Sequence, residues 1–235
     1  TQLHLQNFSL LMTALGLQVK SLLLMVVGQN YLEVKKFFIS VILFLISIKV
    51  SFAENFNFKK IVDLNDPWSS TFINNNELLI TEKSGKIKLV NFNSKKVLEI
   101  KHNLNYLEHG QGGLLDILFK GDYVYISYTE NRGDGKTSTS IAKGEFNKNN
   151  LIFKNIFQAN PPIDSGYHFG SRLAIKDNYL FASAGERGQG MIAQDPTQHP
   201  GSIIRINIDG TIPKDNPKFQ GKSDWLPEIY QIGVR

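Results

Sequence analysis

The sequence predicts an all-β fold made of repeated four-stranded antiparallel sheets. From position 68 onward, short apolar runs alternate with clusters of Asn, Asp, Ser and Gly, which form tight turns between strands. No convincing amphipathic helix interrupts these runs, because their apolar residues lack the helical spacing of about 3.6 residues. The runs fall into groups of four that recur every ~40–60 residues, a period typical of β-propeller blades.

Three groups of strands are expected. The first group is predicted at residues 68–72, 77–81, 86–91 and 96–100. The second group is predicted at residues 113–118, 123–128, 138–145 and 151–157. The third group is predicted at residues 172–175, 179–184, 202–206 and 228–232. Because turn-forming residues separate most neighbouring runs, consecutive strands are expected to pair in an antiparallel manner.

The composition indicates a globular protein without a nucleic-acid partner. Hydrophobic residues make up 42% of the 235 residues, and the formal net charge is +5. Residues 1–53 contain four lysines and one acidic residue, so the rest of the chain carries only 22 basic against 20 acidic residues. This small excess argues against nucleic-acid binding. Because the chain has no cysteine, disulfides, thiolate metal sites and cysteine nucleophiles are excluded.

Residues 34–53 have the features of a secretory signal peptide. Lys35 and Lys36 form a positive start, residues 37–48 are uncharged, and Ser51 and Ala53 are small residues that a signal peptidase accepts. A transmembrane helix is the competing interpretation, but the apolar stretch is shorter than the ~20 residues that cross a bilayer. We expect cleavage after Ala53, a periplasmic or secreted protein, and no membrane span in the mature chain.

Residues 1–33 precede this signal and are left as an unassigned leader. They are weakly apolar and do not begin with Met. We interpret them as upstream sequence translated in frame, with the native start near Val34, while a genuine extended leader is the alternative. The mature domain is therefore expected at residues 54–235.

Several sequence blocks between position 66 and the end of the chain follow one another in a specific order. They read PWSSTFINNNELLITEKSGKIKLV, GQGGLLDI, YHFGSRLAI, YLFASAGERG and PEIYQIGVR. Through these blocks the chain resembles the soluble quinoprotein sugar dehydrogenases, the glucose/sorbosone and aldose sugar dehydrogenase family. Several blocks in one order are a more specific signal than any single motif.

The resemblance implies a six-bladed β-propeller that binds pyrroloquinoline quinone. Such an enzyme oxidises the C1 hydroxyl of aldose sugars to lactones and passes the electrons to an external acceptor. Only three groups of strands are present, so we expect about three blades, the N-terminal half of the propeller. Three blades cannot close a ring, which leaves the first and last blades unprotected. A short sandwich of sheets is the alternative.

By this resemblance His168 is the expected catalytic base. In the family, the histidine of the H-F-G-x-R-L run accepts the proton of the sugar hydroxyl while hydride moves to the quinone, and His168 occupies that position. Histidine suits this role because it titrates near working pH. The glucose-specific branch has Asp before this histidine, whereas this chain has Tyr167, which favours the aldose sugar branch.

Gln111 and Arg235 are expected to bind the cofactor. Gln111 lies in a glycine-rich run that allows close backbone approach to a planar ligand, and the family's glutamine hydrogen-bonds the quinone. Arg235 ends the IGVR run, where a family arginine contacts the cofactor. A planar guanidinium suits the cofactor's carboxylates and its ortho-carbonyl oxygens.

Glu186 is the expected carboxylate partner of His168. It stands where many family members have Asp, in a G-[DE]-x-G-like turn. A carboxylate there would orient the imidazole and raise its basicity. The loop that follows, residues 187–194, is expected to shape the sugar entrance.

Calcium is a further expected cofactor, because it polarises the quinone as a Lewis acid. The resemblance puts its ligands beyond Arg235, so the sequence names no metal ligand. A different class of function is also open: a non-catalytic secreted propeller that binds carbohydrate or protein through the same loops. The combination of Gln111, His168 and Arg235 favours the enzyme, because a pure binding module does not require all three.

Overall fold

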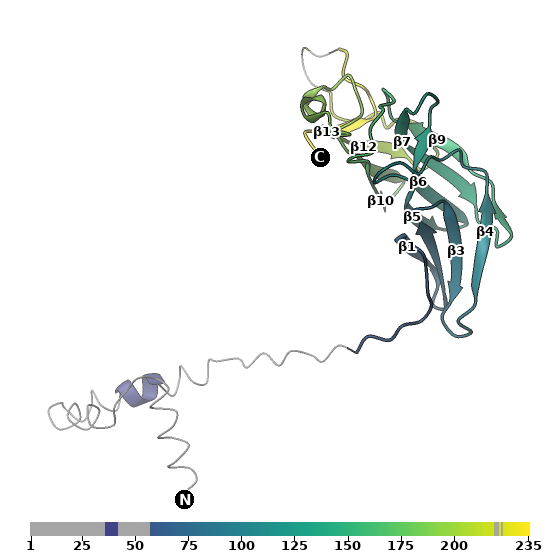
Figure 1. Cartoon of the computed structure of the whole chain (residues 1–235). Coiled ribbons are helices and arrows are strands. Elements are labelled where there is room, and N and C mark those ends of the chain that lie inside the picture. The colour runs from purple at the N-terminus through teal and green to yellow at the C-terminus, as the bar shows by residue number, and fades with distance from the viewer. Residues whose placement is uncertain (1–35, 42–56, 219–220, 222) are drawn as a thin grey trace, which may run out of the picture. The chain divides into compact units, whose positions relative to one another are not determined.

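The computed structural model describes residues 36–41, 57–218, 221 and 223–235. The chain divides into two units, Thr1–Phe58 and Lys59–Arg235, and the strands that the structure describes lie in the second (Figure 1). In the first unit residues 36–41 are helical; the rest of the predicted signal peptide and leader lies outside the described residues. No helix within the described ranges has the length and apolar character that crossing a membrane requires.

The second unit is all-β, as predicted, and its strands form three sheets (Figure 1). The first sheet contains β1 (Pro67–Asn74), β2 (Glu77–Glu82), β3 (Lys86–Asn91), β4 (Val97–His102) and β8 (Asn150–Leu151). The second contains β5 (Leu114–Lys120), β6 (Tyr123–Asn131), β7 (Thr137–Glu145) and β9 (Lys154–Gln158). The third contains β10 (Gly170–Lys176), β11 (Tyr179–Ala184), β12 (Ser202–Asn207) and β13 (Ile229–Ile232). A short 3-10 helix, η1 (Gly190–Gln194), follows β11.

The expected single strand at residues 151–157 is wrong, because this segment divides between two sheets. Its start, β8, pairs in parallel with β4 and makes the first sheet five-stranded, whereas β9 pairs with β7. Phe153 explains the break, because its side chain is buried between the first two sheets. The Phe153 backbone is also bound by Asn103, whose Oδ1 accepts from the N–H at 2.7 Å and whose Nδ2 donates to the carbonyl at 3.0 Å.

The second sheet is buried on both faces. Val124 and Ile126 of β6 belong to the core against the first sheet, whereas Tyr125 belongs to the core against the third sheet. This alternation follows from the two-residue period of a strand. In β11 the pattern differs, because residues alternate between buried and half-buried positions. The third sheet therefore has one well-covered face.

Side-chain hydroxyls on the second strand of a sheet connect it to the first strand of the next sheet. Thr81 on β2 accepts a hydrogen bond from the Ser69 N–H at 3.2 Å. The same hydroxyl donates to the carbonyl of Leu115 on β5 at 2.6 Å. One hydroxyl thus satisfies a peptide group in its own sheet and another in the neighbouring sheet.

The pattern repeats one sheet further along. Ser127 on β6 accepts from the Asp116 N–H at 2.9 Å and donates to the carbonyl of Ser171 on β10 at 2.6 Å. Ser183 on β11 accepts from the Arg172 N–H at 3.2 Å. We call Thr81, Ser127 and Ser183 the hydroxyl relay. The carbonyl that accepts from one hydroxyl and the N–H that donates to the next hydroxyl belong to the same peptide group. The relay is therefore one continuous chain of hydrogen bonds.

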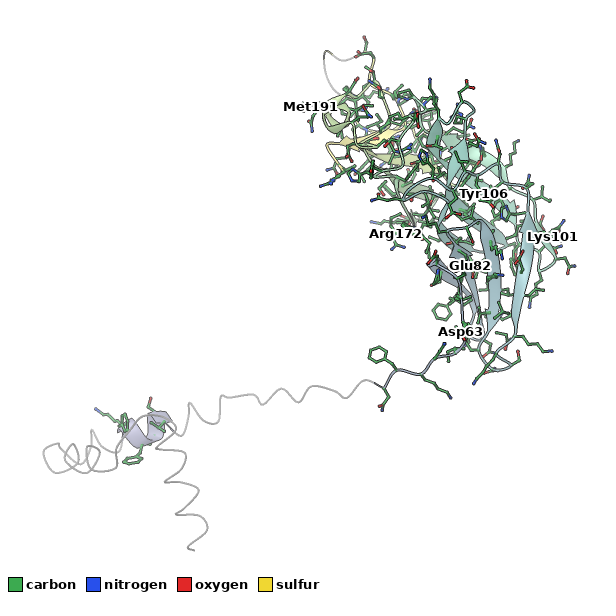
Figure 2. All side chains as sticks on the ribbon, in the orientation of Figure 1. Asp63, Glu82, Lys101, Tyr106, Arg172 and Met191 are labelled. Carbon is green, nitrogen blue, oxygen red and sulfur yellow. The ribbon has the colours of Figure 1, made fainter. Side chains whose placement is uncertain are left out.

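Asp116 adds a charged connection between all three sheets. Its buried carboxylate accepts hydrogen bonds from the Ser69 hydroxyl on β1 and from the Leu173 N–H on β10, the latter at 2.7 Å. Arg172, labelled in Figure 2, has an exposed side chain, and its Nη1 lies 3.1 Å from Asp116 Oδ1. A buried carboxylate is stable only with such partners.

We predict that Ser127→Ala lowers the free energy of unfolding by about 1–3 kcal/mol, because it leaves a buried N–H and a buried carbonyl without partners. Ser70→Ala is the matched control, since Ser70 is exposed on β1 and should change stability by less than about 0.5 kcal/mol. Urea titration of the two variants measures both effects. Equal losses would show that the relay does not stabilise the fold.

Candidate functional site

His168 lies in the connection before β10, with its backbone in the left-handed region at φ 46°. Its N–H donates to Gln111 Oε1 at 2.9 Å. Its carbonyl passes so close to Gly185 that a Cβ there would lie 2.0 Å from the oxygen. Glycine at position 185 is therefore required for this approach, which brings the His168 loop against the end of β11.

Glu186 comes directly after that glycine and meets the imidazole. His168 Nδ1 hydrogen-bonds Glu186 Oε1, which also accepts from the Gly188 N–H at 3.3 Å. Glu186 is only 7% exposed, and its Oε2 is buried without a hydrogen-bond partner. Burial raises the pKa of this carboxyl, but the hydrogen bonds from His168 and from backbone N–H groups outweigh it, so the pKa lies below its usual value.

Arg235 approaches the other side of the imidazole. Its Nη2 lies 3.2 Å from His168 Nε2. The side chains of Gln111 and Arg235 are exposed, whereas that of His168 is 24% exposed. The imidazole is therefore covered by Glu186 on the inner side and reachable from solvent near Arg235.

The carboxylate partner determines which imidazole nitrogen carries the proton. An ionised carboxylate can only accept, so neutral His168 holds its proton on Nδ1 and keeps a lone pair on Nε2. The Arg235 guanidinium can only donate, which agrees with this tautomer. The arrangement can accept a proton at Nε2 while Glu186 stabilises the resulting imidazolium.

The structure brings together all four residues that the sequence singled out. Gln111 precedes β5, His168 precedes β10, Glu186 follows β11 and Arg235 follows β13. His168 is the common member, because it contacts each of the other three. The loop after Glu186 contains η1, whose Met191 is 77% exposed.

Arg187 is a residue of this region that the sequence did not single out as a site candidate. Its side chain is buried, and its guanidinium contacts Thr137 and the carbonyl of Tyr167 beside His168. The only sequence signal is its position directly after Glu186, in the G-E-R-G turn. Its burial depends on a strand fifty positions earlier in the chain, which no local pattern reveals.

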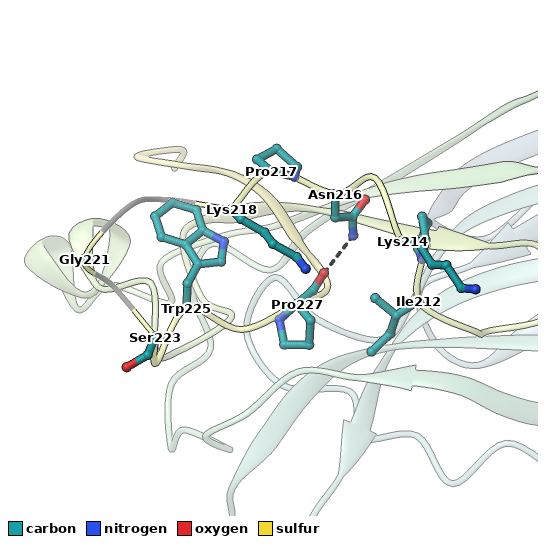
Figure 3. Close-up of a pocket in the computed structure, with 10 residues that line it drawn as sticks. Ile212, Lys214, Asn216, Pro217, Lys218, Gly221, Ser223, Trp225 and Pro227 are labelled. Atoms are coloured by element: carbon teal, nitrogen blue, oxygen red, sulfur yellow. Dashed lines mark hydrogen bonds between the residues drawn. The ribbon is translucent and has the colours of Figure 1, made fainter.

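The remaining candidates for a functional site are a metal site and a cavity. Within the described ranges, no three His, Asp or Glu side chains are arranged to hold a metal ion, and calcium stays a prediction. A cavity of about 880 Å³ has Ile212, Asn216, Trp225 and Pro227 among its lining residues, and Asn216 Nδ2 donates to the Pro227 carbonyl at 2.7 Å (Figure 3). None of the four cluster residues lines this cavity.

Comparison with known proteins identifies relatives of this chain. Residues 64–235 match the family described as Glucose / Sorbosone dehydrogenase. Aldose sugar dehydrogenase YliI of Escherichia coli (strain K12) is 32% identical over 182 residues, covering 73% of this chain and 49% of the relative. Quinoprotein glucose dehydrogenase B of Acinetobacter calcoaceticus is 30% identical over 220 residues, covering 78% of this chain and 45% of the relative.

A solved structure supports the same relationship. The soluble aldose sugar dehydrogenase from Escherichia coli, in its apo-form, superposes with a TM-score of 0.69 and 32% identity, over 73% of this chain and 52% of that one. The chain spans about half the length of the curated relatives that it matches. Because the match extends from position 64 through the last strand, the chain belongs to the glucose/sorbosone dehydrogenase family of sugar oxidoreductases.

Proposed function

We propose that this chain is the N-terminal half of an enzyme that oxidises the C1 hydroxyl of aldose sugars to lactones, with pyrroloquinoline quinone as hydride acceptor. The observation that carries the proposal is the His168 imidazole, whose Nδ1 is bonded to a buried carboxylate and whose Nε2 faces only the exposed side chain of Arg235 among the described residues. Family membership favours this enzyme over a non-catalytic propeller that only binds carbohydrate or protein.

The proposed architecture is a six-bladed propeller, of which residues 54–235 form about three blades. The hydroxyl relay supports a further sheet beyond the third. Thr81 and Ser127 each donate to the following sheet, whereas the described part of the chain offers no acceptor to the Ser183 hydroxyl. A fourth blade would supply that acceptor as a first-strand carbonyl. Residues 34–53 are proposed to be the signal peptide, and residues 1–33 a leader outside the mature protein.

The exposed residues of the cluster suit an anionic, carbonyl-rich cofactor. Arg235 has further guanidinium N–H groups besides the one that faces His168. Gln111 uses Oε1 to hold the His168 backbone, which leaves its Nε2 group available as a donor. When bound, pyrroloquinoline quinone supplies an ortho-quinone that accepts hydride. Gln111 and Arg235 are the residues of this chain proposed to hold its polar edge.

The proposed role of His168 is to take the proton of the sugar hydroxyl at Nε2. Arg235 now occupies the space beside this nitrogen, so its side chain must turn away before a sugar hydroxyl can reach it. Glu186 keeps the proton of the neutral imidazole on Nδ1 and then stabilises the doubly protonated ring. The attraction between Glu186 and the imidazole therefore grows as positive charge develops on the ring. Because this attraction is stronger in the transition state than in the ground state, it lowers the barrier to proton transfer.

The remaining features of the proposal concern substrate and location. Tyr167 is 62% exposed next to His168, and with η1 it is proposed to border the sugar entrance of an aldose-specific enzyme. We propose a periplasmic or secreted location, an external electron acceptor, and a calcium ion held by residues beyond Arg235.

Glu186→Gln is predicted to change how stability depends on pH. A carboxyl with a lowered folded pKa stabilises the fold above its unfolded pKa, and this stabilisation is lost as pH falls through the folded value. The stability advantage of the wild-type chain over Glu186→Gln should therefore shrink as pH falls from about 5 to about 3. Urea titrations across this range measure it. A difference that stays constant would contradict the lowered pKa.

His168→Gln is predicted to slow turnover strongly without abolishing cofactor binding. In a full polypeptide that carries this segment, reconstituted with the quinone and calcium, loss of the base should lower kcat by about 10²–10⁴-fold. Reduction of a dye by aldoses measures turnover, and a quinone titration measures binding. His102→Gln is the control, because His102 bonds the Gly85 carbonyl in the first sheet. Undiminished turnover in His168→Gln would refute the proposed mechanism.

A further inference from the structure

Arg187 is a buried cation without a carboxylate partner. Its side chain is 2% exposed, and within the described residues no Asp or Glu oxygen lies within ion-pair distance of it. Burial lowers the pKa of the guanidinium to about 10, so the group remains charged at neutral pH. An arginine held in this way costs free energy, unless neutral acceptors replace the water around it.

The acceptors that replace water all belong to two segments of the chain, one at Thr137 and one at residues 165–167. Arg187 Nη1 donates to the Thr137 carbonyl at 3.1 Å, and Nη2 donates to the Thr137 hydroxyl at 2.7 Å. Nε donates to the Tyr167 carbonyl at 3.1 Å, and Nη2 also donates to the Ser165 carbonyl. The guanidinium lies over the Phe169 ring, 3.7 Å from its centroid. The charge therefore holds the first residue of β7 and the residues on both sides of His168.

The loop that contains His168 has an unfavourable backbone conformation that contacts from Arg187 stabilise. His168 has a left-handed backbone, which costs a non-glycine residue roughly 1–2 kcal/mol. Arg187 itself has φ 59°, and its N–H donates to the His168 carbonyl at 3.4 Å. The backbone and the side chain of one residue thus hold the loop that sets the direction of the imidazole.

We propose that Arg187 is a positioning residue for His168: its guanidinium holds residues 165–169 against β7 so that Nδ1 of the imidazole meets Glu186. The guanidinium is directed away from solvent into the protein, so it acts through His168 and not on the substrate. The proposal deepens the proposed function and rests on it for its consequence in turnover, but the positioning itself is a property of the cofactor-free chain.

Lysine cannot reproduce this arrangement. Its ammonium is a compact charge that cannot extend a planar fork to Thr137, Ser165 and Tyr167 together. Arg187→Lys keeps the charge while it removes the geometry. Arg205→Lys is the matched control, because Arg205 is also buried, at 8% exposure, and lies over the rings of Tyr179 and Tyr230 in the third sheet.

The first test uses the cofactor-free chain with ¹⁵N-labelled histidine. In the wild type, His168 should show a protected Nδ1–H signal at low field, identified by its loss in His168→Gln. Arg187→Lys should broaden or abolish this signal, whereas Arg205→Lys should leave it unchanged. A signal that persists in Arg187→Lys overturns the proposal and leaves Arg187 with a purely structural role.

A milder variant covers the case in which Arg187→Lys does not fold. Thr137→Val removes the hydroxyl that accepts from Nη2 and retains the carbonyl, the volume and the arginine itself. It should weaken the same His168 signal. An unchanged signal in Thr137→Val, when Arg187→Lys fails to fold, counts against the proposal.

The second test separates this inference from the proposed function. In the quinone-loaded full polypeptide, Arg187→Lys should lower kcat by about 10²-fold with little change in KM, because misplacement of the base by about 1 Å has that effect. If the wild type shows the expected histidine signal but no aldose-dependent turnover, the proposed function fails and the positioning role stands. If the wild type turns over and Arg187→Lys is unaffected in kcat and in the histidine signal, the positioning role fails alone.

Discussion

The hydroxyl relay is the interaction on which the arrangement of the three sheets depends. Apolar side chains fill the spaces between the sheets, but such contacts are not directional and allow neighbouring sheets to slide. Hydrogen bonds from Thr81 to the Leu115 carbonyl and from Ser127 to the Ser171 carbonyl fix the register. The buried Asp116 carboxylate adds a second restraint among the first strands. Buried peptide groups without such partners would be costly.

Two residues of the candidate site lie close to the hydrogen bonds that fix the register of the sheets. Gln111 and His168 lie in connections that lead into first strands, a few residues from the relay's acceptor carbonyls. His168, Ser171 and Arg187 all have positive φ values, and backbone strain of this kind is tolerated where the surroundings hold it in place. Two of these residues, His168 and Arg187, are joined by a backbone hydrogen bond, so the strained backbone of the site is held by its own contacts.

The electrostatics of the site change from its inner side to its outer side. Glu186 is buried and bonded to the imidazole, and its pKa lies below the usual value, whereas the charge of Arg187 is directed into the protein. Arg235 is exposed and faces the opposite nitrogen of His168. This order favours the imidazole tautomer that carries its proton on Nδ1, beside Glu186, and its lone pair on Nε2, beside Arg235. The same order suits an incoming ligand that carries negative charge.

The sequence by itself determined the all-β class and most strand positions, because apolar alternation and turn-forming residues act over a few neighbouring residues. The identities of Gln111, His168, Glu186 and Arg235 came from the resemblance to a family, since their spacing alone does not imply a cluster. Only the tertiary structure decided that residues 151–157 divide between two sheets and that Arg187 holds the His168 loop. It alone revealed the relay, whose partners are 34 and 44 positions apart. Such contacts depend on how whole sheets pack, and no local pattern of residues carries that information.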